Sequence, residues 1–326
     1  MGNSTSGPVL VVQVEEEVFA TPATSPRREP ATSFFKRAKP PVVDASFADY
    51  HPLSGLPTPG YQGNLSKKQQ AALDALRAQM AALGLTEQVA AAACAPAEDT
   101  DGLLLRFLRA RGFLVPKAAE LLQHDLAWRA EHAVSELTSR PEEEVLGCDP
   151  ALFERYLPGW YGSSDLQGRP AQWQKWGDLR VDELLKSTSH EQLVMHHVWQ
   201  QEKQMRRLAE NAHAHGVLLS QCVSVVDAAH WHPALATRKA MAFLREIAGM
   251  DQAHFPERMG MIITINAPYT LSACWVVISG WLDPATRAKV QIISSDKYWK
   301  PLLATIFAPD QIPLEYGGTA PVTFGL

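Results

Sequence analysis

Residues 255–289 read FPERMGMIITINAPYTLSACWVVISGWLDPATRAK, and this stretch decides the fold that we expect. It contains a strand-like run, Met261–Asn266, which ends at Asn-Ala-Pro. The next segment, Leu271–Leu282, is apolar almost all the way round, which is typical of a helix buried in protein or in contact with lipid. At about twelve residues it is too short to cross a bilayer, which needs roughly twenty.

The apolar segment ends abruptly at Leu-Asp-Pro, and the turn after it carries Thr286, Arg287 and Lys289. An apolar helix is thereby placed beside a small polar and basic cluster. This combination suits an amphipathic ligand, whose tail lies along the helix and whose head group lies at its end.

The bulk composition is that of an ordinary globular protein, with 326 residues of which 46% are hydrophobic and 20% charged. The formal charge of −5 argues against a nucleic-acid binder, because such proteins depend on neutralising phosphates. The four cysteines show no CxxC spacing, which favours reduced thiols over a disulfide framework. No transmembrane segment and no secretory h-region are recognisable, so we expect a cytoplasmic protein that is peripheral to membranes.

Residues 1–62 are expected to form a disordered arm, because they are rich in Pro, Ser and Thr and show little hydrophobic periodicity. Met1–Ser6 fits the M-G-x-x-x-[ST] pattern, which would place a myristoyl group on Gly2. Phe34–Lys39 mixes aromatic and basic residues in a way that suits an anionic membrane surface. Both features are also consistent with chance in a low-complexity tail, so acylation stays a hypothesis.

Residues 63–147 are predicted to form a small helical domain. Its first helix opens with the capping box Ser66-Lys67-Lys68-Gln69 and runs to Leu83. Three further helices are expected at Thr86–Cys94, Leu103–Arg111 and Pro116–His132. Thr100 or Asp101 is the expected N-cap of the helix Leu103–Arg111.

Residues 148–326 alternate strand-like and helical segments. The expected strands are Ala171–Trp176, Leu218–Asp227, Met261–Asn266 and Val290–Ser294. The expected helices are Glu191–His213, Leu235–Met250, Leu271–Leu282 and Tyr298–Phe307. Strands separated by helix-length crossovers imply a mainly parallel sheet covered by helices, so the fold class is α/β.

The sequence carries no signature of a common catalytic site. It has no GxSxG, P-loop, GxGxxG or HExxH motif, which argues against an enzyme. The histidine pairs could ligate a metal, but no acidic or thiol ligands cluster at suitable spacing. We therefore predict no metal site and interpret these histidines as surface or loop residues: His196-His197, His213-x-His215 and His230-x-His232.

Three further groups of residues each admit two interpretations. Ser220, Cys222 and Ser224 alternate onto one strand face, and they either line a pocket or satisfy buried backbone groups. The aromatic residues Trp160, Tyr161, Trp173 and Trp176 are more often used for core packing. Arg106, Arg109 and Arg111 form a solvated helix face, or a phosphate site if they lie near Lys289.

Several motifs, taken in order, resemble the CRAL-TRIO lipid-binding family, and in particular its yeast-type phosphatidylinositol/phosphatidylcholine transfer proteins. They cover residues 56–318 and are LPTPGYQGNL at 56–65, LLLRFLRARGF at 103–113, DLQGRP at 165–170, VVDAAH at 225–230, FPERMG at 255–260, INAP at 265–268, LDPATRAK at 282–289 and Gly317-Gly318. The resemblance implies a helical cap on an α/β domain. In that domain the sheet floors a lipid cavity, which a gating helix closes.

The resemblance also assigns functional residues. The gate would include Leu271, Trp275, Val276, Ile278, Trp281 and Leu282. The phosphoinositide head group would be held by Arg111, Glu257, Thr286 and Lys289, while Gly112 stands where the family has a lysine. The pocket for a second lipid would contain Tyr161, Gln201, Cys222, Ser224 and Asp251. Of the residues expected for phosphatidylcholine, Tyr161 is kept and Ser224 conservatively replaces a threonine, whereas Gln201, Cys222 and Asp251 are clear departures.

The resemblance thus implies a monomeric, non-enzymatic phospholipid carrier that binds membranes transiently. The bound phospholipid is a ligand, and no cofactor is expected. Phosphatidylinositol is the favoured ligand, and it exchanges with a second lipid. Two alternatives stay open: a carrier of a sterol precursor, tocopherol or retinoid-like hydrophobe, and a lipid-sensing module that recruits a partner through the arm.

Overall fold

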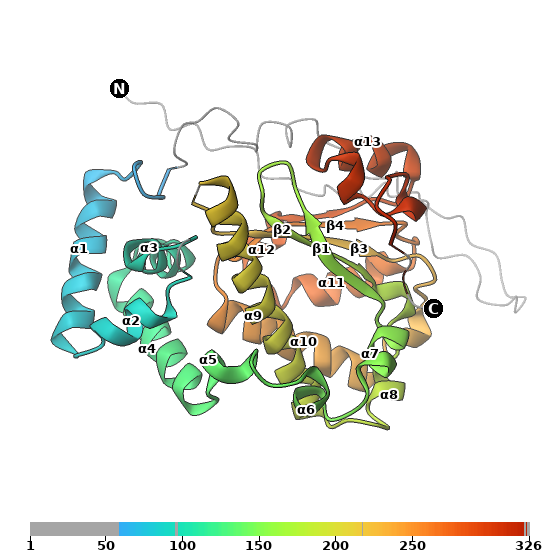
Figure 1. Cartoon of the computed structure of the whole chain (residues 1–326), viewed down its shortest axis with the longest axis horizontal. Coiled ribbons are helices and arrows are strands. Elements are labelled where there is room, and N and C mark those ends of the chain that lie inside the picture. Colours follow the sequence, from blue (N-terminus) through green and yellow to red (C-terminus); the bar gives the residue numbers. More distant parts are fainter. Residues whose placement is uncertain (1–58, 95–96, 217, 323, 325–326) are drawn as a thin grey trace, which may run out of the picture. The chain divides into compact units, whose positions relative to one another are not determined.

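The computed structural model describes residues 59–94, 97–216, 218–322 and 324 (Figure 1). The expected arm up to residue 58, with Gly2 and Phe34–Lys39, lies outside the described residues. The described chain has a helical N-terminal region followed by a region with a five-stranded, mostly parallel sheet, which confirms the predicted α/β class.

The N-terminal region contains α1 (Lys67–Ala82), α2 (Thr86–Ala92), α3 (Thr100–Ala110) and α4 (Val115–Glu131). The capping box at Ser66 and Gln69 is present as predicted. The N-cap of α3 is Asp99, not Thr100 or Asp101, because the Asp99 carboxylate accepts a hydrogen bond of 2.8 Å from the Gly102 amide. Leucine-rich faces of these helices form one apolar core.

Four short helices connect the two regions or flank the sheet: α5 (Val134–Leu137), α6 (Glu142–Leu146), α7 (Pro150–Tyr156) and α8 (Val181–Leu184). None of them was predicted. Each has at most seven residues, which is too short for a helical period to show in the sequence.

The sheet has the order β1-β2-β3-β4-β5, in which β1 is antiparallel to β2 and all other pairs are parallel. The strands are β1 (Gly159–Ser164), β2 (Pro170–Lys175), β3 (Cys222–Asp227), β4 (Met259–Ile265) and β5 (Val290–Ile292). The edge strand β1 was not predicted, because its glycines and serines have low strand propensity. The predicted start of the strand Leu218–Asp227 was wrong, since β3 begins at Cys222 and leaves Ser220 outside it.

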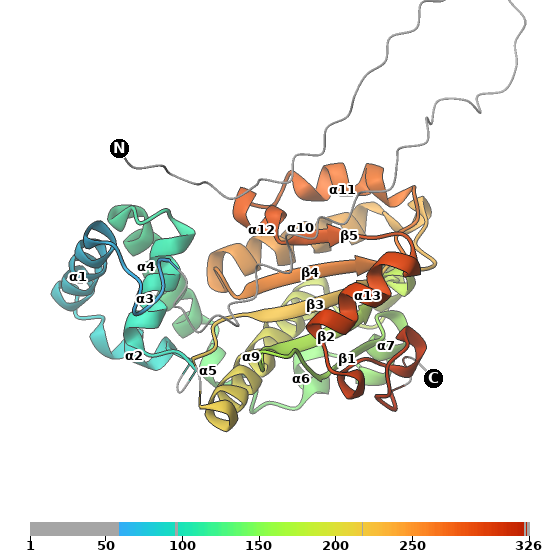
Figure 2. The same cartoon turned by 90° about the horizontal axis from the view of Figure 1, so that it is seen from above.

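The five remaining helices are α9 (His190–His215), α10 (Arg238–His254), α11 (Leu271–Ser279), α12 (Pro284–Ala288) and α13 (Asp296–Ile306). Figure 2 shows α9 on the β1–β2 side of the sheet and α11 and α12 on the β5 side. One sheet face packs against α13, with Val225, Ile263, Trp299 and Leu303 in a continuous core. None of the described helices has both the length and the apolar character needed to cross a membrane.

The predicted gating helix is shorter than expected, because α11 ends at Ser279 and Gly280 is its C-cap. Trp281 and Leu282 lie in the connection that follows. The expected turn is itself a short helix, α12, because Asp283 caps it and Pro284 occupies its first position.

Candidate functional site

A cavity with largely apolar walls lies on the sheet face opposite α13 and has a volume of about 300 Å³, within the range of ligand pockets. Successive residues of a strand point to opposite faces, so Ser224 and Val226 line the cavity while Val223 and Val225 enter the packed core. Its walls come from α9, α10, α11 and α12, and the N-terminal region contributes Arg109, Ala110 and Arg111.

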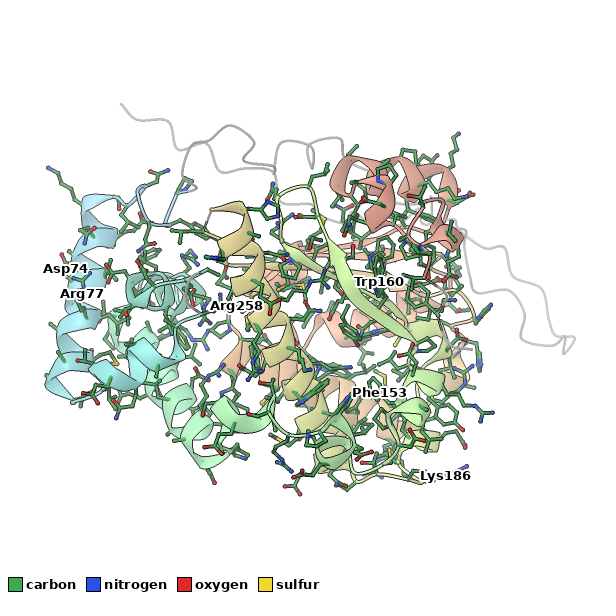
Figure 3. All side chains as sticks on the ribbon, viewed as in Figure 1. Asp74, Arg77, Phe153, Trp160, Lys186 and Arg258 are labelled. Carbon is green, nitrogen blue, oxygen red and sulfur yellow. The ribbon has the colours of Figure 1, made fainter. Side chains whose placement is uncertain are left out.

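Much of the wall is apolar. Phe153, labelled in Figure 3, lines the cavity. Other apolar lining residues are Leu193, Phe243, Leu244, Ile247, Leu271, Trp275 and Ile278. Burial of each CH₂ group in such surroundings contributes about 0.8 kcal/mol, so this wall suits long acyl chains.

Helix α11 has one face towards the cavity and one towards solvent, and none of its residues is fully buried. Leu271, Trp275 and Ile278 line the cavity, as does Leu282 beyond the helix end. Val276 is 72% exposed and therefore lies on the outer face. Trp281 is partly buried but is not part of the cavity lining.

The end of this helix is tied to α10 by Gln252. The Gln252 amide nitrogen donates to the carbonyl of Trp281 at 3.0 Å, and its amide oxygen accepts from the backbone N–H of Asp283 at 2.8 Å. Asp283 in turn accepts hydrogen bonds from the backbone N–H and the hydroxyl of Thr286, at 2.9 and 2.7 Å. One side chain of α10 thus fixes the connection between α11 and α12.

The four residues expected to hold a head group all line the same cavity: Arg111, Glu257, Thr286 and Lys289. The Lys289 ammonium donates to the Glu257 carboxylate at 3.3 Å. The Arg111 guanidinium donates to the carbonyl of Ala110 at 2.9 Å, which leaves donors for a ligand. Glu257 has a φ of +60°, a strained backbone conformation that is often found at functional sites.

Arg109 lines the cavity beside these residues, although we did not assign it to the site from the sequence. Its Nη1 donates to the carbonyl of Gly60 at 3.2 Å, and its guanidinium lies 3.7 Å from the centre of the Tyr61 ring. Its Nε is buried and makes no hydrogen bond with the described residues. The signal for it was the triplet Arg106, Arg109 and Arg111, whose phosphate interpretation depended on proximity to Lys289.

Arg106 has a different environment, and its interpretation as a solvated residue was wrong. It is buried and donates to the Glu98 carboxylate at 3.1 Å and to the carbonyl of Pro256 at 3.1 Å. Arg258, labelled in Figure 3, donates to the same carboxylate at 2.6 Å. Burial would raise the pKa of Glu98, but the two guanidinium groups outweigh it and hold that pKa below its usual range.

The residues expected for the second lipid are only partly brought together. Gln201, Ser224 and Asp251 line the cavity, whereas Tyr161 and Cys222 are not part of the lining. Tyr161 lies behind the wall, where its hydroxyl accepts from the amides of Gln174 and Gln200 at 2.8 and 3.0 Å. Cys222 packs against a separate core under α9, and burial raises the pKa of its thiol to about 12.

The histidines and aromatic residues also correct two interpretations. His196 is fully buried and pairs with Glu142 at 2.9 Å, and His197 lines the cavity and pairs with Asp251 at 2.8 Å, so neither is a surface residue. Among the described residues, no group of three or more His, Cys, Asp or Glu side chains could hold a metal ion. Trp173 packs in the core as expected, but Trp176 lines the cavity.

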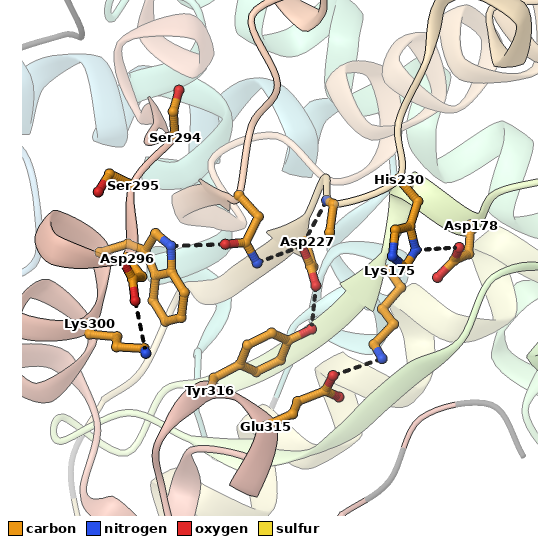
Figure 4. Close-up of a pocket in the computed structure, with 14 residues that line it drawn as sticks. Lys175, Asp178, Asp227, His230, Ser294, Ser295, Asp296, Lys300, Glu315 and Tyr316 are labelled. Atoms are coloured by element: carbon orange, nitrogen blue, oxygen red, sulfur yellow. Dashed lines mark hydrogen bonds and ion pairs between the residues drawn. The ribbon is translucent and has the colours of Figure 1, made fainter.

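A second pocket, of about 620 Å³, lies where the parallel strands end (Figure 4). Its charged side chains are bonded to neighbouring groups. Asp227 accepts from the Asn266 amide at 3.0 Å and from the Tyr316 hydroxyl at 2.9 Å, and Lys175 pairs with Glu315 at 2.8 Å. This network ties the strand ends together, and no buried polar group in it is left for a ligand.

Comparison with known proteins identifies the family of the chain. A family model described as CRAL/TRIO domain matches residues 154–318, and one described as CRAL/TRIO, N-terminal domain matches residues 72–124. The chain is 30% identical over 279 residues to the SEC14 cytosolic factor of Candida glabrata, covering 85% of this chain and 86% of the relative. It is also 30% identical over 278 residues to the Sec14 cytosolic factor of Schizosaccharomyces pombe, covering 85% and 91%.

The fold is similar to the crystal structure of Sfh5, with a TM-score of 0.62 over 79% of this chain and 90% of that one. Their sequence identity is 15%, so this likeness shows the fold alone. The family match and the two relatives also show the family, because together they extend over most of the chain. The chain belongs to the CRAL/TRIO family as a Sec14-like lipid-binding protein, and proteins of the Sec14 family are lipid-transfer proteins rather than enzymes.

Proposed function

We propose that this protein binds phosphatidylinositol and transfers or presents it between membranes, exchanging it for a second lipid. The observation that supports this most is the convergence of Arg111, Glu257, Thr286 and Lys289 at one part of a largely apolar cavity. Cationic side chains pair well with a phosphate, and apolar walls suit the acyl chains. Relatives named cytosolic factor support a cytoplasmic protein that meets membranes transiently.

The exposed face of α11 suggests how exchange proceeds. Val276 and Val277 are 72% and 49% exposed, so insertion into a membrane would remove apolar surface from water. As the helix swings into the interface, its inner face opens the cavity and a lipid exchanges. Closure then buries the acyl chains, which dominate affinity, while the head-group contacts set specificity.

Lys289→Ala tests the head-group assignment. We expect phosphatidylinositol transfer between vesicles to fall by roughly tenfold, because the phosphate loses a charge-assisted contact. Transfer of other lipids should stay within about twofold. Lys186→Ala is the matched control, because Lys186 is exposed and its one ion pair with the described residues is to Glu183. Equal loss for every lipid would indicate a general gate defect, and no loss would contradict the assignment.

A carrier of a non-phospholipid hydrophobe is the second candidate, and Gly112 favours it because no side chain stands there to meet a phosphate. Mass spectrometry of lipids that co-purify with the protein separates the two candidates. Recovery of phosphatidylinositol is expected, and recovery of only sterols or isoprenoids would contradict the first. The domain division at 63–147 and 148–326 and the recruiting role of the arm remain proposals.

A further inference from the structure

The cavity has a second polar region, far from the basic cluster. In the sheet register, Gln172 of β2 pairs with Ser224 of β3, Ser224 with Ile262 of β4, and Ile262 with Val290 of β5. Lys289 directly precedes Val290. Three strand spacings of about 4.8 Å therefore put Gln172 roughly 14 Å from the Lys289 end of the floor.

Amide side chains surround this second region. Gln172 and Gln174 come from the floor, and Gln200 and Gln201 come from α9, which packs on β2. The Gln174 amide is fully engaged, because it accepts from the Trp176 indole at 3.1 Å and donates to Tyr161 at 2.8 Å. It serves to hold Tyr161 in place behind the wall.

The other three amides each donate to a protein group and keep their carbonyl oxygens free. Gln172 donates to the Ser224 hydroxyl at 3.3 Å, Gln200 to Tyr161 at 3.0 Å, and Gln201 to Asp251 at 2.9 Å. Their carbonyl oxygens make no hydrogen bond with any residue that the structure describes. The wall therefore presents three neutral acceptors, and the Ser224 hydroxyl, which accepts from Gln172, retains its proton as a donor.

This arrangement selects among ligand chemistries. A phosphate brings only acceptors, so carbonyl oxygens would repel it, and the cations that suit it lie at the other end of the cavity. A quaternary ammonium has no hydrogen to donate. The nearby carboxylate, Asp251, pairs with His197 at 2.8 Å and accepts from Gln201 at 2.9 Å, in both cases through Oδ1. A hydroxyl group matches the site, because its one proton is donated to a carbonyl oxygen of the wall and its oxygen accepts from Ser224.

We propose that the β2–α9 end of the cavity binds a second lipid whose polar end is an uncharged hydroxyl. This inference rests on the proposed function, in which the cavity holds lipids, and names the class of the second ligand. The hydroxyl donates to a carbonyl oxygen of Gln172, Gln200 or Gln201, and the apolar wall holds the rest of the molecule.

The test incubates the full chain with vesicles that contain phosphatidylinositol, dioleoylglycerol and phosphatidylcholine at equal mole fractions. Lipids bound to the re-isolated protein are then quantified by mass spectrometry. We expect dioleoylglycerol to exceed phosphatidylcholine by about tenfold. In the double variant Gln172→Met, Gln200→Met this preference should fall by roughly tenfold, because two acceptors are lost while side-chain size is kept.

Gln204→Met is the matched control, because Gln204 lies one turn from Gln200 on α9, is buried, and does not line the cavity. It should leave the lipid ratios unchanged. Equal capture of phosphatidylcholine by the wild type would overturn the inference, as would an unchanged ratio in the folded double variant. Capture of phosphatidylinositol without dioleoylglycerol would refute only this inference, whereas absence of phosphatidylinositol would refute the proposed function.

Discussion

Glu257 and Arg258 are neighbours in the chain, yet they belong to two ion-pair clusters that differ in how far the protein satisfies them. Arg258 joins Glu98 and Arg106 in a cluster whose side chains are at most 7% exposed. Glu257 pairs with Lys289 at 3.3 Å in the wall of the cavity, with side-chain exposures of 16% and 13%. The first cluster is closed to ligands and the second is accessible from the cavity.

The difference separates charges that hold the fold from charges that meet a ligand. The Glu98 carboxylate is shared by two guanidinium groups, and Arg106 also binds the carbonyl of Pro256. This cluster therefore ties the N-terminal helices to the backbone just before Glu257. Around Glu257, the donors of Lys289, Arg109 and Arg111 are only partly used, as a binding site requires.

Removal of one partner from the closed cluster should have the largest effect on stability. Glu98→Ala leaves two buried guanidinium groups without their carboxylate, so we expect a loss of about 3–5 kcal/mol in the free energy of unfolding. Urea denaturation measures it. Glu87→Ala, on the exposed surface of α2, is the control and should change stability by less than about 0.5 kcal/mol. A loss below about 1 kcal/mol for Glu98→Ala would show that the cluster does not hold the regions together.

The closed cluster should also give the protein a pH dependence. Because the pKa of Glu98 is lowered in the folded state, its stabilisation is fully present above the unfolded pKa of about 4.3 and is lost as the pH falls through the folded value. Urea midpoints of wild type and Glu98→Gln between pH 7 and pH 3 should therefore converge at the acid end. A constant difference across this range would contradict the role of the charge.

The smallest effect is expected at Gly112, the position at which the family has a lysine. Gly112 has a φ of +58°, and a Cβ added there meets nothing within 4 Å. Gly112→Lys should therefore cost only about 1–2 kcal/mol of stability, from the left-handed backbone. The new ammonium should raise phosphatidylinositol binding severalfold in the vesicle assay, and Gly112→Gln controls for the backbone cost. Equal binding by the two variants would show that this position lies beyond reach of the head group.

The sequence was sufficient for the fold class and for the elements with strong periodicity or capping, such as α1 with its box at Ser66. It could not show β1, whose glycines carry no strand signal, or the end of α11, where apolar residues continue past Gly280. Glu257, Thr286 and Lys289 were assigned to the candidate site through the resemblance to the family. Helical spacing alone could not separate Arg106 from Arg109 and Arg111, because burial on α3 depends on contacts with Glu98, in the loop just before the helix, and with Pro256, 150 residues further along the chain.

The Gln252 tether bears on how often the cavity is accessible. Its two hydrogen bonds to the backbone of residues 281 and 283 contribute about 0.5–1.5 kcal/mol each, and no residue of α11 is fully buried. Releasing this segment should therefore cost far less than global unfolding, which takes roughly 5–15 kcal/mol in a typical protein. Helix α11 and the connection after it are expected to detach from the cavity many times for each unfolding of the sheet. Their backbone amide hydrogens should therefore exchange with solvent faster than those of the strands.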